Sequence, residues 1–453
     1  MSTINQAIDQ FIDDKRDDYI KSLSELCAQP SISSSDEGTL KCADLVVNLL
    51  EQRGFDVQKV STPKNPVIVG RAKGKSERTI LLYNHYDVQP VEPLDLWTNP
   101  PFEPTLREGA LYARGAKDDK GEFLGRLAAV DAVREANGGE LPCGVTFVVE
   151  GDEEVSSPHI ASFVQENLDL IQSHGSIWEE GSLNREGRPV LTLGVRGILY
   201  VELSVSTMSQ DAHSGGASSL PNAAWRLHWA LSCLKDKTEH ILIDGFYDDV
   251  IPPSEIDLQL FEQLPDPESY LREQFEIETF VRSATGKELN KAVFEPTCNI
   301  AGISAGHYGP GMKTVIPAAA SAKLDFRLVP DQDPEDIFAK LRSHLDKNGF
   351  ADVDLALKGH MWPAKSSGDD PFVKLTATSA EDVYGKPSVI TPLVGGSSPI
   401  YAFAKPLGDI PVVTAGVGYW DNRTHAPDEH VRLEDFVKGA KHIARIINGF
   451  GNL

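Results

Sequence analysis

Two stretches decide the expected fold: TILLYNHYD from Thr79 to Asp87, and VTFVVEGDEE from Val145 to Glu154. Each is a short apolar run of β-forming residues that ends in polar and acidic side chains. The segment 122–136 between them has a helical pattern. An alternation of strand and helix predicts a mostly parallel sheet flanked by helices. Ligands of such sheets bind beyond the carboxyl ends of the strands, where both acidic segments are expected.

The same pattern continues towards both ends of the chain, whereas the middle differs. Helices are predicted at 4–28, 41–53, 372–384 and 433–447, with a strand at 411–414. The middle reads as strands at 199–206, 323–328 and 353–357, with helices at 222–234 and 334–347. We therefore expect a catalytic domain of residues 1–198 and 368–453, and an inserted α+β domain of residues 199–367.

Composition limits the classes of function. The 453 residues are 41% hydrophobic and 24% charged, which suits a globular protein of more than one domain. Lys and Arg number 43 against 67 Asp and Glu, a formal net charge of −24 that disfavours nucleic acid or anionic membrane as the main partner. The five scattered cysteines indicate free thiols. With no apolar signal core and no run long enough to cross a membrane, we expect a cytoplasmic location.

The polar segments offer metal ligands, although each is weak alone. His85 and Asp87 are spaced so that both point to one face of an extended strand, and a metal-binding His commonly donates its second N–H to a carboxylate. Taken alone, ARGAKDDKG (113–121) and the pair Glu153 and Glu154 are each more typical of solvated or acidic loops, and the pair Glu179 and Glu180 and the segment RTHAPDE (423–429) are each weak signals. Together they place histidines and several carboxylates at strand exits. Nitrogen and carboxylate ligands without thiolate suit hydrolytic zinc, and paired ions share a bridging carboxylate.

With these motifs, the chain resembles the co-catalytic di-zinc metallopeptidases. This family includes carnosine-type dipeptidase, glutamate carboxypeptidase, acetylornithine deacetylase, succinyl-diaminopimelate desuccinylase and aminoacylase. The resemblance covers nearly the whole length and looks closest to the dipeptidase branch. It is carried by the segments ARGAKDDKG, EGDEE, GVRG, DAHSGG, GFYDDV, KTVIP, FRLVPDQDP and GGSSP.

The resemblance implies two divalent metal ions, with zinc expected and manganese or cobalt as alternatives. It implies these roles in the catalytic domain: His85 as a ligand of the first ion, Asp87 as the residue that orients it, Asp118 as the bridge, Glu153 as the general base, Glu154 and His425 as ligands of the second ion, and Glu180 as the remaining ligand of the first. Glu180 is preferred to Glu179 from its spacing to GVRG, with a slip of one residue left open. The dipeptidase branch usually has Asp here. The resemblance also implies a cis peptide between Asp118 and Asp119.

In the inserted domain, the resemblance implies a lid that forms a homodimer. His213 would reach the partner's active site and stabilise the oxyanion, and four residues match substrate contacts: Thr314, Arg327, His360 and Ser397. Arg327 would clamp a free carboxylate, since a guanidinium makes bidentate pairs; a surface arginine is the alternative. Leu393 and Val394 stand where the dipeptidase branch tends to have Arg-Glu, which predicts a less polar pocket near Ser397.

The favoured hypothesis is a dipeptidase that acts on small substrates with a free amine and a free carboxylate. The alternative within the family is an N-acyl amino acid deacylase or a carboxypeptidase, which needs only the carboxylate. From another class, the chain could be a binding or scaffold protein that keeps the fold without metal. The full set of ligand and base candidates argues against that reading.

Overall fold

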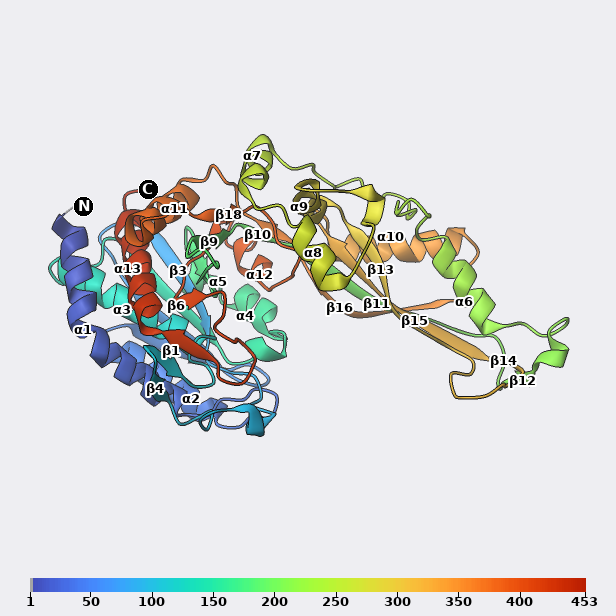
Figure 1. The fold of residues 1–453 in the computed structure, drawn as a ribbon, viewed down its shortest axis with the longest axis horizontal. Coiled ribbons are helices and arrows are strands. Elements are labelled where there is room, and N and C mark those ends of the chain that lie inside the picture. Colours follow the sequence, from blue (N-terminus) through green and yellow to red (C-terminus); the bar gives the residue numbers. More distant parts are fainter. Residues whose placement is uncertain (1–2) are drawn as a thin grey trace. The chain divides into compact units, whose positions relative to one another are not determined.

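The computed structural model describes residues 3–453, which form two compact units (Figure 1). The main unit comprises the chain up to Leu193 together with Lys365–Pro392 and Ala402–Leu453. The inserted unit comprises Gly194–Ala364 and Leu393–Tyr401. The short strands β10 (Gly194–Val195) and β17 (Ala364–Lys365) mark two of the boundaries in the sequence.

The main unit is built on a six-stranded mixed sheet. Its order is β1 (Asp56–Val60), β2 (Val67–Ala72), β6 (Gly144–Glu150), β3 (Thr79–His85), β7 (Ser176–Trp178) and β19 (Val412–Thr414). The strands from β6 to β19 run parallel. Strand β2 is antiparallel to β6, and β1, at the edge, is antiparallel to β2. All of β6 is buried, which explains its uninterrupted apolar run. The prediction of a mixed, mostly parallel sheet is confirmed.

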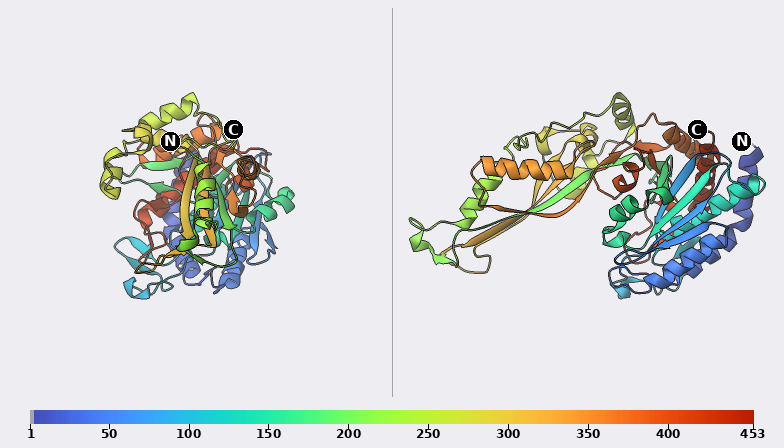
Figure 2. Two further views of the ribbon diagram at one scale, coloured as in Figure 1. Left: turned by 90° about the vertical axis from the view of Figure 1, so that its right-hand side faces the viewer. Right: turned by 180° about the vertical axis from the view of Figure 1, so that it is seen from behind.

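Long helices cover this sheet. Helix α3 (Lys120–Ala136) packs against α1 (Thr3–Cys27) and α13 (Leu433–Phe450), and the three lie together on one face (Figure 2). Helix α2 (Thr39–Glu51) packs on β1 and β2, and α11 (Pro371–Tyr384) packs on α13. The shorter helices are α4 (Ile160–Glu166), α5 (Leu168–Ile171) and α12 (Tyr401–Ala404). None of the helices in residues 3–453 is long and apolar enough to cross a membrane.

Two small sheets bring distant loops of the main unit together. One has the order β18 (Val389–Thr391), β9 (Pro189–Thr192), β8 (Ser182–Leu183) and β20 (Gly418–Tyr419). The other has the order β21 (His430–Arg432), β5 (Ala110–Tyr112) and β4 (Thr105–Arg107). The pairing of β21 with β5 holds the loop before His430 beside the loop that follows Tyr112.

The inserted unit has its own antiparallel sheet and core. The sheet order is β13 (Thr297–Ala305), β15 (Ala319–Leu328), β11 (Gly197–Ser206) and β16 (Asp354–Met361). Burial alternates along β11 because one face packs against α6 (Ala223–Ser232) and α10 (Pro334–Lys347). The remaining elements are β12 (Ala212–His213), β14 (Val315–Ile316), α7 (Glu255–Gln263), α8 (Glu268–Phe275) and α9 (Glu288–Lys291).

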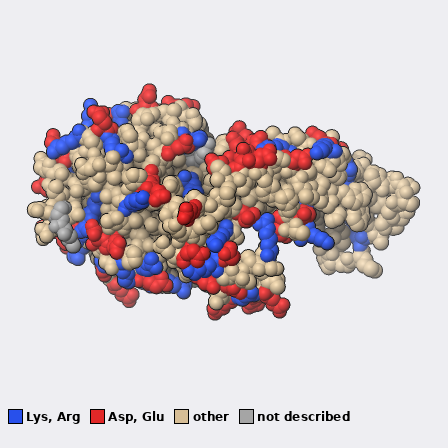
Figure 3. All heavy atoms as spheres, turned by 90° about the horizontal axis from the view of Figure 1, so that it is seen from above, with Lys and Arg blue, Asp and Glu red and all other residues tan. Residues whose placement is uncertain are grey.

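One segment is in a different unit from the one expected. Residues 393–401 follow α11 and β18 in the sequence, yet they pack in the inserted unit. The Arg196 N–H donates to the Gly396 carbonyl at 2.8 Å, and Val195 forms a parallel bridge with Val394. These backbone bonds attach the segment to the start of the inserted unit, a pairing that hydrophobic periodicity does not reveal. On the face shown in Figure 3, basic and acidic side chains are interspersed.

Candidate active site and metal centre

The polar residues of the main unit gather at the carboxyl ends of three neighbouring strands. His85 is the last residue of β3, and Glu179 directly follows β7. Glu153 and Glu154 begin a single 3-10 turn (Glu153–Val155) shortly after β6. Because β6, β3 and β7 are adjacent and parallel, their exits meet at one edge of the sheet.

Asp118 stands between two histidines. Its Oδ1 lies 3.2 Å from His85 Nε2, and its Oδ2 lies 3.0 Å from His425 Nε2. Glu154 Oε2 is 3.2 Å from the same His425 nitrogen. Ligand atoms therefore converge in two groups, one of His85, Asp118 and Asp119 and one of Asp118, Glu154 and His425. Asp118 is common to both, which is the arrangement of a carboxylate that bridges two cations.

The local geometry fixes the tautomer of His85. Its Nδ1 lies 3.0 Å from the backbone carbonyl oxygen of Asp87, and a carbonyl can only accept. Nδ1 therefore carries the proton and donates it. In the neutral ring, the lone pair of Nε2 then faces Asp118, as a metal ligand requires.

Asp87 does more than contact His85. Its buried carboxylate accepts the backbone N–H of Glu153 at 3.2 Å and that of Glu154 at 3.0 Å. Oδ1 also lies 3.5 Å from His85 Nδ1. Asp87 thus ties the exit of β3 to the turn after β6, a role that the sequence analysis missed.

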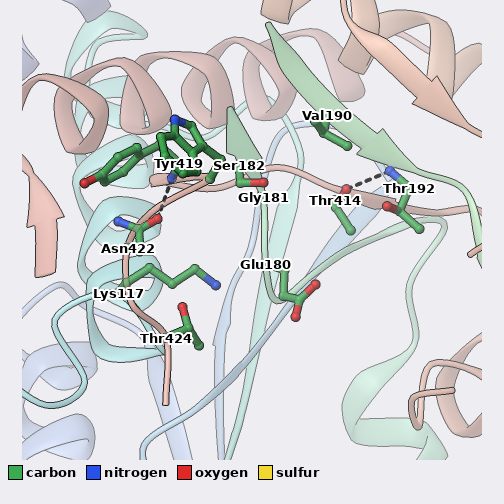
Figure 4. A pocket seen from close by; sticks show the side chains of 11 residues that line it. Lys117, Glu180, Gly181, Ser182, Val190, Thr192, Thr414, Tyr419, Asn422 and Thr424 are labelled. Atoms are coloured by element: carbon green, nitrogen blue, oxygen red, sulfur yellow. Dashed lines mark hydrogen bonds between the residues drawn. The ribbon is translucent and has the colours of Figure 1, made fainter. Parts of the chain in front are cut away.

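The first histidine is approached by Glu179 and not by Glu180. Glu179 Oε2 lies 4.0 Å from His85 Nε2, is buried, and has no hydrogen-bond partner among the described residues. Glu180 is exposed, and its side chain lines a separate pocket beside Lys117 (Figure 4). The chain leaves the β conformation here, because Glu180 has a φ of 68°. The geometry therefore favours Glu179, the alternative that the sequence left open.

Crowded carboxylates dominate the electrostatics. Burial raises the pKa of Glu153 to about 7, with Glu154 and Asp118 adding to it, and burial raises the pKa of Glu179 well above its usual value. Hydrogen bonds to Asp118 and Glu154 raise the pKa of His425 to about 10. Without a cation this crowding therefore favours the protonated form of each group, and a bound divalent ion would favour the deprotonated form. Imidazole nitrogens, several carboxylates and the unpartnered Glu179 oxygen together fit divalent ions such as zinc, manganese or cobalt.

A buried carboxylate holds the loop that carries Asp118. Glu429 accepts the backbone N–H groups of Gly115 (3.1 Å), Lys117 (3.1 Å) and Asp118 (3.0 Å). It also accepts a hydrogen bond from Arg114 Nη1 at 2.8 Å, and both side chains are 1% exposed. The peptide between Asp118 and Asp119 is cis, as the resemblance implied. The sequence analysis missed Glu429, whose contacts depend on the pairing of β21 with β5.

The inserted unit contains the other predicted site residues as two pairs and one separate residue. Arg327 Nη1 donates to Ser397 Oγ at 2.7 Å. His213 Nε2 lies 3.1 Å from Thr314 Oγ1, and both residues are exposed. His360 is in neither pair, and it contacts Glu335 (3.8 Å) and the ring of Trp362.

A protein-family model matches most of the chain. The model described as Peptidase family M20/M25/M40 matches residues 81–449. This chain belongs to that family. The resemblance inferred from the motifs and the prediction of a metal-dependent peptidase are thereby confirmed.

Relatives of known name extend over nearly the full length of this M20 chain. A Cys-Gly metallodipeptidase of Schizosaccharomyces pombe is 28% identical over 466 residues, covering 95% of each protein. The Beta-Ala-His dipeptidase of Homo sapiens is 28% identical over 469 residues, covering 96% of this chain and 90% of that protein. The crystal structure of an M20 family metallo-carboxypeptidase from Sulfolobus solfataricus has a TM-score of 0.85 and 33% identity, covering 96% of this chain and 99% of that one.

Proposed function

We propose that this member of the M20 family is a two-metal dipeptidase. The observation that carries the proposal is Asp118, whose two oxygens face His85 and His425 at hydrogen-bond distance. The names of full-length relatives support dipeptides as the substrate class, since both are dipeptidases. A binding or scaffold protein would not need such a cluster of buried and half-buried, mutually repelling carboxylates.

The ligand set follows from the site. One ion would be held by His85, Asp118 and Glu179, and the other by Asp118, Glu154 and His425. When bound, two such ions polarise the scissile carbonyl and lower the pKa of water to near neutrality. Elemental analysis of Glu179→Gln and Glu180→Gln tests the set. Loss of metal is expected from the first change only, and the reverse result would restore Glu180 as the ligand.

The protein's own residues account for the remaining steps. Glu153 takes a proton from the attacking water and delivers it to the amine that leaves as the C–N bond breaks. Arg327 binds the free carboxylate of the substrate, and Ser397 holds its guanidinium in place. His213 donates a hydrogen bond to the developing oxyanion. Its Nδ1 accepts the Gly215 N–H at 3.0 Å, so in the neutral ring the proton is on Nε2, where a donor is needed.

A carboxypeptidase or N-acyl amino acid deacylase is the second candidate. The metallo-carboxypeptidase from Sulfolobus solfataricus is 33% identical to this chain, more than either dipeptidase above. Leu393 and Val394 before Gly395 also remove the polar pair expected of the dipeptidase branch. A specificity that ignores the free amine fits this apolar replacement.

One assay separates these functions. Steady-state kcat/KM is measured for dipeptides, the same dipeptides N-acetylated, and longer peptides, with zinc, manganese or cobalt supplied in turn. A dipeptidase cleaves the free dipeptides best. Preference for acetylated substrates identifies a deacylase, and removal of single residues from longer peptides identifies a carboxypeptidase. Absence of hydrolysis with every metal would contradict all three.

We also propose that the chain forms a homodimer through its inserted unit. Strand β13 is an edge of its sheet and exposes Ile300 and Ile303. On α6, Trp225 and Trp229 are 56% and 52% exposed and stack on each other. A second copy would cover both features, and sedimentation velocity at micromolar concentration should show a dimer that Trp229→Glu weakens.

The five free cysteines are consistent with a cytoplasmic location.

A further inference from the structure

The pocket lined by Lys117 and Glu180 lies in the main unit, next to the candidate metal ligands. It encloses ≈ 250 Å³, room for about eight water molecules at about 30 Å³ each, which is about as many as the non-hydrogen atoms of one acidic residue. Three of its lining residues directly adjoin candidate ligands in the chain, since Lys117 precedes Asp118, Glu180 follows Glu179 and Thr424 precedes His425. Its other walls include Thr192, Thr414 and Trp420.

Among the residues that line this pocket, Lys117 is unusual because it is buried without a direct partner for its charge. The residue is only 6% exposed, yet its Nζ has no hydrogen bond and no ion pair within 4.0 Å among the described residues. Lys120, three residues later, shows the ordinary solution for a buried lysine. Its Nζ donates to the carbonyls of Leu26 (3.1 Å) and Gln29 (2.7 Å). The Lys117 Nζ is not among the fully enclosed polar atoms that lack a partner, so it reaches the space of the pocket. Burial lowers the pKa of Lys117, but attraction to Asp118, Glu122 and Glu180 outweighs it and raises that pKa above its usual value. A ligand carboxylate in the pocket would give this ammonium a direct hydrogen-bond partner.

A group of opposite charge lines the same pocket. The Lys117 side chain extends into the pocket, and Glu180 lies across from the Lys117 ammonium with its carboxylate turned away from it (Figure 4). The Thr192 N–H donates to Thr414 Oγ1 at 3.0 Å, which fixes that wall. A ligand that satisfies both charges must itself carry a carboxylate and an ammonium.

We propose that this pocket binds the residue on the acyl side of the scissile bond and selects one that carries both a free ammonium and a free carboxylate. Lys117 pairs with the substrate carboxylate, and Glu180 pairs with the ammonium. Two sources share this chemistry: an N-terminal aspartyl or glutamyl residue linked through its α-carboxyl, and one linked through its side-chain carboxyl. The inference rests on the proposed function, because it specifies the substrate of the same site.

The test compares substrates that differ only in the charge of one group. For the wild type, kcat/KM for Glu-Ala should exceed that for Gln-Ala by about 10- to 100-fold, the scale of a hydrogen bond to a charged partner. The side-chain-linked γ-glutamyl-alanine is assayed beside them to identify the source. Lys117→Gln should bring the Glu/Gln ratio close to one, whereas Lys117→Arg should keep it well above one. Glu180→Gln should reduce discrimination between Glu-Ala and its N-acetyl derivative.

Two measurements keep this test separate from the proposed function. Metal content is determined for every variant, so that a loss of ions is not mistaken for a loss of selectivity. Binding of free glutamate and glutamine to the metal-loaded protein is measured by calorimetry, which needs no turnover. A wild type that does not prefer the acidic member in either assay, or a ratio that Lys117→Gln leaves unchanged, overturns the inference. Failure to cleave any dipeptide contradicts the proposed function, while the calorimetric comparison still decides the role of the pocket.

Discussion

The two units hold their candidate residues in different ways. In the main unit, two buried carboxylates outside the proposed set of metal ligands hold the loops through hydrogen bonds. Asp87 accepts two backbone N–H groups and Glu429 accepts three. In the inserted unit, Arg327 and His213 are each joined to one neighbouring side chain, and His213 is exposed. Groups that take part in bond breaking require fixed geometry. Groups that recognise the ends of a substrate can be positioned when the substrate binds.

The largest effect is expected at Glu153. Glu153→Ala should retain metal and fold but lower kcat by about 10²–10⁴-fold, the usual contribution of a positioned general base. Elemental analysis and thermal unfolding check the first two properties, and steady-state kinetics check the third. Glu25→Ala, on an exposed site of α1, is the control. Retention of more than about a tenth of wild-type kcat would contradict the assignment, given that range.

The next effect concerns His213 and the dimer. His213→Ala should lower kcat by about 10²–10³-fold, as for loss of one oxyanion donor. If each His213 serves the other subunit's active site, mixing this variant with Glu153→Ala creates heterodimers with one intact site. Random exchange should then restore about a quarter of wild-type activity, as pairing in a two-fold dimer requires. No recovery, despite exchange shown by mass spectrometry, means that His213 acts within its own subunit or not at all.

A somewhat smaller loss of activity is expected at Arg327, and it should depend on whether the substrate carries a free carboxylate. Arg327→Ala should weaken transition-state binding of free-carboxylate substrates by roughly 2–4 kcal/mol, the scale for a lost charge-assisted pair. Dipeptide amides lack the carboxylate, so they should be poor substrates of the wild type and change little in the variant. Equal losses on acids and amides would show that Arg327 is a structural residue that holds Ser397.

The sequence predicted the parts of the site that strand exits determine. His85, Glu153 and Glu154 follow buried β-runs, and parallel strands bring such exits together. Alternation could not decide between Glu179 and Glu180, because β7 ends at Trp178 and the next residues leave the extended conformation. The resemblance supplied His425 and Arg327, whose short motifs are not diagnostic alone.

The supporting contacts were harder to predict for a physical reason. Glu429 lies 311 residues after Asp118 in the chain, and long-range contacts such as the pairing of β21 with β5 bring the two together. Segment 393–401 joins the inserted unit through backbone bonds near Arg196, and backbone groups carry no residue-specific pattern. Helix bounds were predicted well where caps are explicit, as for α10, which begins after Asp333.

The smallest of these effects tests whether a buried carboxylate holds the loop of Asp118 in place through backbone hydrogen bonds. Glu429→Gln keeps the volume but replaces one accepting oxygen with an NH₂ group, which faces N–H donors and leaves Arg114 without its buried counter-charge. The free energy of unfolding should fall by about 1–3 kcal/mol, and metal affinity should weaken by about 10–100-fold, as for other residues that orient ligands. Glu434→Gln is the matched control, because Glu434 pairs with Lys438 on the surface of α13; its unfolding free energy should change by no more than about 0.5 kcal/mol. Urea unfolding and metal titration measure both quantities. If the two variants behave alike, Glu429 does not hold the loop that carries Asp118. The proposed difference between the two units, that buried carboxylates fix the loops of the main unit, would then be contradicted.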